Sequence, residues 1–86
     1  MDDGIKRAPT REEIDEESRR IRRLRIAVQL ALNIISQGRI PYEEAQDLAA
    51  ATKNVALALF PDSAATYDLI YRPKFQRLIS EVYRLQ

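Results

Sequence analysis

Any catalytic chemistry in this sequence would have to come from carboxylates, lysines, hydroxyls or arginines, because the chain contains no histidine and no cysteine. Outside the N-terminal region the acids gather at Glu43, Glu44 and Asp47. Glu43 and Asp47 are one helical turn apart, but no histidine accompanies them as it does in di-iron helical bundles. Acids at the start of a helix are explained by the helix dipole alone. Two isolated glycines also cannot form a phosphate-binding loop. We therefore predict that the protein is not an enzyme and has no metal, cofactor or catalytic site.

Five arginines within seven residues form the second chemically distinctive group: Arg19, Arg20, Arg22, Arg23 and Arg25. Such a run could bind the phosphates of a nucleic acid, which we keep as an alternative function. However, Asp15 lies four residues before Arg19 and Glu16 four before Arg20, which is the favourable spacing for ion pairs along a helix. The first 25 residues contain seven acids and eight bases, so this region is not a net basic patch. A solvated, self-paired helix face explains the run better than a nucleic-acid or protein partner does.

A third group lies near the C-terminus, where Tyr67 and Tyr71 are four residues apart and Arg72 follows them. Tyrosine and arginine are enriched among the residues that dominate binding interfaces, so we name all three as candidate partner-surface residues. The alternative is that the two rings pack on neighbouring helices with their hydroxyls at the surface. In that case Asp68 and Arg72, also four residues apart, would form an ion pair.

The element expected to organise the chain is a long amphipathic helix over residues 14–36. Its apolar face repeats every seven residues, with further apolar residues at the spacing of three and four between them: Ile14, Ile21, Leu24, Val28, Ala31, Leu32 and Ile35. Thr10 and Glu13 match a capping box at its start. We expect the rest of the chain to fold against this face.

The same helix carries a second apolar stripe on its opposite side, at Ile26, Leu30 and Ile34. A helix that is apolar nearly all round is either enclosed by its own domain or covered by another chain. Eighty-six residues leave little protein to cover both sides. We therefore predict a homodimer through this stripe, with Leu57 as a further candidate, and keep as the alternative that the later helices wrap around it.

Turn signals divide the remaining chain into three helices. Gly38 is placed to end the first helix, and Pro41 suits the first turn of the second, over residues 42–60. A short helix is predicted over residues 64–71, and Pro73 should interrupt it. The predicted fold is all-α: a small helical bundle built on a long N-terminal helix in an antiparallel αα-hairpin, with two shorter C-terminal helices separated near Pro73. Residues 11–86 should form one domain after a frayed leader at residues 1–10.

Composition narrows the function without naming it. With 45% hydrophobic and 31% charged residues and a net charge of +1, the chain fits a soluble globular domain without a global field to attract nucleic acid or anionic membranes. No apolar run approaches the ~20 residues of a membrane span, and we expect a cytoplasmic protein. The predicted function is a non-catalytic helical interaction or scaffolding module, with a small regulator docking on one enzyme as a further alternative to nucleic-acid binding.

Overall fold

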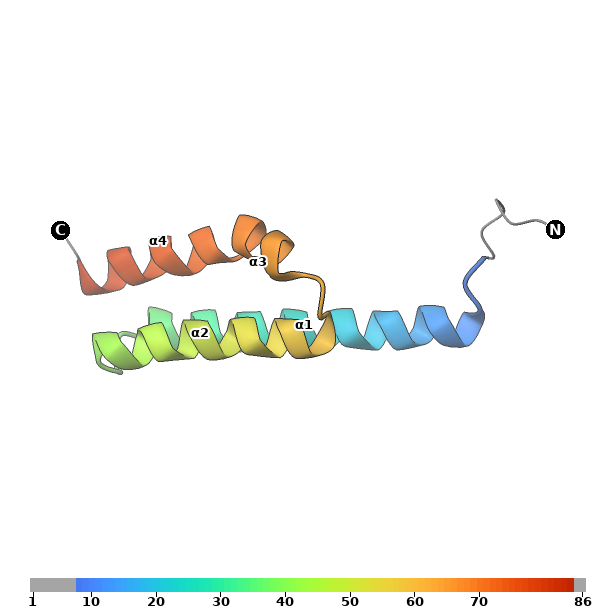
Figure 1. The fold of residues 1–86 in the computed structure, drawn as a ribbon. Helices are drawn as coiled ribbons and strands as arrows, with labels where there is room; N and C mark the ends of the chain where they lie inside the picture. The colour runs from blue at the N-terminus through green and yellow to red at the C-terminus, as the bar shows by residue number, and fades with distance from the viewer. Residues whose placement is uncertain (1–7, 85–86) are drawn as a thin grey trace.

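The computed structural model describes residues 8–84, which form four α-helices and no strand (Figure 1). Helices α1 (Arg11–Ser36) and α2 (Tyr42–Leu59) lie antiparallel as a hairpin, and α3 (Ala64–Ile70) and α4 (Arg72–Tyr83) return along it. The predicted all-α bundle, with its long first helix and two short C-terminal helices, is therefore confirmed. Of the predicted leader, residues 8–10 are exposed and non-helical, and residues 1–7 lie outside the described part of the chain.

Local sequence signals set the ends of α1. The Glu13 amide donates to Thr10 Oγ1 at 3.1 Å and the Thr10 amide donates to Glu13 Oε1 at 2.7 Å, so the predicted capping box forms. Past its other end Gly38 adopts a left-handed conformation, with φ +66°, and its amide donates to the Ile35 carbonyl at 3.0 Å. This turn reverses the chain and makes the hairpin.

Pro41 and Pro73 behave almost as predicted. Pro41 is the N-cap of α2, one residue earlier than the first-turn position that the sequence suggested. Pro73 is the second residue of α4, so the chain restarts a helix there instead of kinking one continuous rod. The junction is Tyr71, whose amide still donates to the Tyr67 carbonyl while its own carbonyl accepts from the Phe75 amide.

The core lies where α1, α2, α3 and α4 meet over the C-terminal half of α1. Its buried hydrophobic residues come from all four helices: Val28, Ala31, Ile35, Ala45, Ala56, Tyr67, Phe75 and Ile79. Alanines at the α2 positions let that helix pack closely on α1. The buried hydroxyl of Thr52 is satisfied because it donates to the Leu48 carbonyl at 2.8 Å.

The N-terminal part of the predicted core face is uncovered, which corrects the expectation from the sequence. Ile14 and Ile21 remain 51% and 41% exposed. The reason is length: at 1.5 Å per residue, α1 spans about 39 Å and α2 only about 27 Å. Residues 11–19 of α1 therefore project past the bundle as a helical arm (Figure 1). The radius of gyration is 16.8 Å, against the ~12 Å of a compact chain of this size.

Candidate functional site

The second apolar stripe of α1 is an uncovered apolar feature of the bundle. Ile26, Leu30 and Ile34, which we call the outer stripe, are 52%, 57% and 40% exposed. They lie on the side of α1 opposite Val28 and Ile35. The side that carries Val28 and Ile35 packs into the core. The prediction that the chain does not enclose its own outer stripe is confirmed, and the alternative in which later helices wrap around it is wrong. Pairing with a second copy stays a prediction.

Leu57 does not extend the outer stripe. It is half-buried on α2, one turn after Lys53, and Lys53 bonds to Asp68 of α3. Residues four apart share a helix face, so Leu57 is on the side of α2 turned toward α3 and away from the outer face of α1. Leu57 stays a self-association candidate that lies apart from the outer stripe. The pattern on one helix does not show which neighbour faces it.

Two of the five clustered arginines are held by neighbours in this structure. Arg19 and Arg20 both reach Glu16, with N···O distances of 2.9 and 3.5 Å, and Arg19 pairs with Glu16 instead of the predicted Asp15. The Arg19 guanidinium holds the pKa of Glu16 below its ordinary value. Arg20 also lies 5.6 Å above the centre of the Phe60 ring, a cation–π contact that fixes the end of α2 to α1.

The other three arginines do not form a single patch. At about 100° per residue, Arg22, Arg23 and Arg25 are spread over roughly 160° of the helix circumference. All three are exposed. A phosphate backbone running along one side of α1 could not contact all of them together.

Tyr67 is in the core and not at the surface, which corrects its placement among the partner-surface candidates. It is 4% exposed, and its ring centre lies 5.3 Å from that of Tyr71. Its hydroxyl is inaccessible to solvent and has no hydrogen-bond partner in the described residues. Burial, with smaller contributions from Tyr71 and Asp68, raises the pKa of Tyr67 to about 12. Tyr71 is half-buried and Arg72 is exposed, as a surface role requires.

Asp68 pairs across the bundle instead of along its own helix. Its Oδ2 accepts a hydrogen bond from Lys53 Nζ at 3.0 Å, and its Oδ1 is 2.9 Å from the same nitrogen without accepting one. The predicted Asp68–Arg72 ion pair does not form. Arg72 is left without an ion pair or a side-chain hydrogen bond within residues 8–84.

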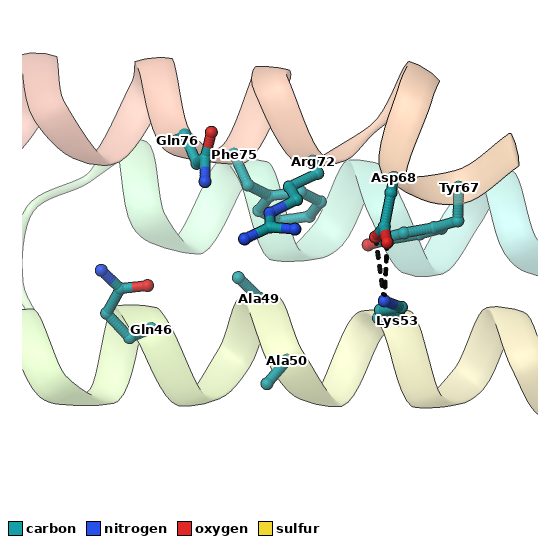
Figure 2. A pocket seen from close by; sticks show the side chains of 9 residues that line it. All are labelled: Gln46, Ala49, Ala50, Lys53, Tyr67, Asp68, Arg72, Phe75 and Gln76. Atoms are coloured by element: carbon teal, nitrogen blue, oxygen red, sulfur yellow. Dashed lines mark hydrogen bonds and ion pairs between the residues drawn. The ribbon is translucent and has the colours of Figure 1, made fainter. Parts of the chain in front are cut away.

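These residues border a groove between α2 and the α3–α4 segment, with a volume of about 330 Å³ (Figure 2). In Figure 2 the Arg72 guanidinium points into the gap toward α2, and the Tyr67 ring points along the gap toward Asp68. We call this feature the α2–α4 groove; its lining residues are Gln46, Ala49, Ala50, Lys53, Tyr67, Asp68, Arg72, Phe75 and Gln76.

Comparison with known protein families, curated proteins and solved structures finds no match to this chain. The described residues also contain no group of three or more metal-ligating side chains, and no helix among them is long and apolar enough to cross a membrane. The outer stripe and the α2–α4 groove are the two surfaces from which a function can be inferred.

The sequence singled out the outer stripe but not the groove. No sequence pattern distinguishes the polar lining residues Lys53, Gln46 and Gln76. They become neighbours of Tyr67 and Arg72 only when α3 and α4 fold back over α2. The adjacent alanines Ala49 and Ala50 are the one local sign of a hollow in the sequence of α2.

Proposed function

We propose that this chain is a non-catalytic helical interaction module that self-associates, with two copies meeting through the outer stripe. A single exposed aliphatic residue is ordinary, but a continuous line of three on one helix face is a patch that a partner would shield from water. The observation that supports the proposal is that Ile26, Leu30 and Ile34 are all at least 40% exposed.

The geometry of a symmetric pair suits the stripe. In an isologous contact between antiparallel α1 helices, Leu30 would face Leu30 of the second copy, and Ile26 would face Ile34. Beside the stripe Gln29 Nε2 donates to Asn33 Oδ1 at 3.2 Å, which gives a polar rim whose groups already bond to each other.

The small buried area limits the proposed dimer to a weak, concentration-dependent one. The exposed fractions of the three residues add up to about one and a half side chains per copy. At roughly 1.5–3 kcal/mol per fully buried aliphatic side chain, the pair would gain about 5–9 kcal/mol before the cost of association, which is itself about 4–15 kcal/mol. Sedimentation over a range from low micromolar to near-millimolar concentration tests the proposal, and a chain that stays monomeric throughout would refute it.

Nucleic-acid binding through Arg19–Arg25 remains the competing proposal. Its support is that Arg22, Arg23 and Arg25 are exposed, and the Glu16 pairs and the spread around α1 weigh against it. Titration with duplex DNA and RNA at two salt concentrations separates the two proposals, because phosphate contacts make affinity fall steeply with salt. The small regulator of one enzyme and the cytoplasmic location also remain predictions, and the regulator would use the same outer stripe.

A further inference from the structure

The α2–α4 groove has the size of a small-ligand site. Its volume of about 330 Å³ lies at the lower end of the roughly 300–1,000 Å³ range of ligand pockets. The space arises because α2 presents small methyl groups to its middle, at Ala49 and Ala50, while Phe75 and Tyr67 close its inner side. An apolar body of about ten non-hydrogen atoms would rest on these four side chains.

The charged groups around this apolar surface leave one cation unpaired. Lys53 and Asp68 neutralise each other, and the one remaining charge in the groove is the Arg72 guanidinium, which has no ion pair within residues 8–84. The Gln76 amide, at the same edge, likewise has no hydrogen-bond partner in the described chain. A local surplus of one positive charge suits a monoanion, and the Asp68 carboxylate would repel an ion of higher charge.

Tyr67 forms part of the wall of the groove and cannot donate to a ligand in it. Its side chain is 4% exposed and its hydroxyl is inaccessible to solvent, so a ligand oxygen could not reach that hydroxyl. Figure 2 shows the ring directed along the groove, on the side from which Arg72 also reaches into it.

We propose that the α2–α4 groove binds a small organic carboxylate, whose carboxylate is paired with the Arg72 guanidinium. The apolar part of the ligand lies on Ala49 and Ala50. A guanidinium presents two parallel N–H groups that match the two oxygens of a planar carboxylate, which favours this class over a compact inorganic anion. The inference goes beyond self-association and does not depend on it.

Phenylacetate is a suitable probe, and phenylacetamide is its neutral counterpart of the same shape. For a ligand of about ten non-hydrogen atoms we expect a dissociation constant of about 1 mM, measured by amide chemical-shift titration of the ¹⁵N-labelled full chain. The amide should bind at least tenfold more weakly, because it lacks the charge that pairs with Arg72. Saturable shifts should be confined to residues that line the groove.

Matched variants locate the site. Arg72→Gln should weaken phenylacetate binding at least tenfold, whereas Arg77→Gln, on an exposed α4 position that does not line the groove, should leave it unchanged. Ala50→Leu should fill the hollow and abolish binding, whereas Ala51→Leu, the adjacent exposed position outside the groove, should not.

Tyr67→Phe is a further control. Because the hydroxyl has no partner within the described residues and is inaccessible to solvent, its removal should leave the thermal midpoint unchanged or higher and the phenylacetate affinity unchanged. Three results would overturn the proposal: no saturable shift in the unmodified chain, equal affinity for phenylacetate and phenylacetamide, or an equal loss of phenylacetate affinity in the Arg72 and Arg77 variants.

Discussion

Replacing Leu30 by glutamate is the sharpest test of the proposed dimer. Leu30 is the middle residue of the outer stripe and is 57% exposed in the single chain. A substitution at so exposed a helix position should change the free energy of unfolding of the monomer by no more than about 0.5 kcal/mol. A change in assembly can therefore be measured on a chain that is still folded.

The expected loss of dimer stability follows from the symmetric contact. Each Leu30 would lose its share of apolar burial, about 1–1.5 kcal/mol, and the dimer contains two copies. The two new carboxylates would face each other, which adds about 1 kcal/mol in water and about 4 kcal/mol in a partly buried setting. A total of about 3–7 kcal/mol raises the dissociation constant by at least roughly 100-fold.

Sedimentation velocity over a concentration series is the assay, and Leu69→Glu is the matched control. Leu69 is also an exposed leucine on a helix, at 78%, but it lies on α3 and not on the outer stripe. We expect Leu30→Glu to be monomeric at every concentration, while Leu69→Glu assembles like the unmodified chain. If both variants weaken assembly equally, the interface is not the outer stripe.

Two further predictions concern the fold itself. Gly38→Ala should lower the free energy of unfolding in urea by about 1–2 kcal/mol, because Gly38 has φ +66° and an added Cβ would lie 3.3 Å from Val82 Cγ1. Gly38→Asn should lose less, since asparagine tolerates the left-handed region, and an unchanged Gly38→Ala midpoint would contradict the reasoning. Stability should also fall above pH 10 through Tyr67, whose pKa rises from 10.0 to about 12 on folding. The unfolded chain then loses this proton first, so the contribution is complete below pH 10 and is lost as the pH approaches 12. Unfolding curves at pH 8 and above pH 11 should show that the free energy of unfolding declines less in Tyr67→Phe than in the unmodified chain. Equal declines would contradict the assignment of the effect to Tyr67.

The features that the sequence predicted well depend on neighbours along the chain. The capping box at Thr10, the left-handed Gly38 and the helix restart at Pro73 each follow from residues within four positions of one another. The outer stripe was also predictable, because one helix places residues four apart on the same face.

The larger errors concern contacts between helices. Ile14 and Ile21 continue the heptad of Val28 and Ile35, and no feature of α1 shows that α2 ends before it covers them. Asp68 had a suitable partner four residues away at Arg72, yet it pairs with Lys53, fifteen residues away. Tyr67 became a core residue for the same reason: the pattern of a seven-residue helix does not show which side a neighbouring helix will cover.

The two proposed surfaces lie on opposite sides of the hairpin, which makes them separable. The outer stripe faces away from the core side of α1, on which α2 and α4 pack, whereas the α2–α4 groove opens between those two helices with α1 behind it (Figure 2). A second copy on the outer stripe would therefore leave the groove open. We expect Leu30→Glu to abolish assembly while phenylacetate affinity stays within about twofold of that of the unmodified chain, because interactions at separated sites that share no partner add independently. A loss of both properties together would mean that the groove forms only in the assembled protein, so that the wall supplied by α4 depends on the partner bound to α1.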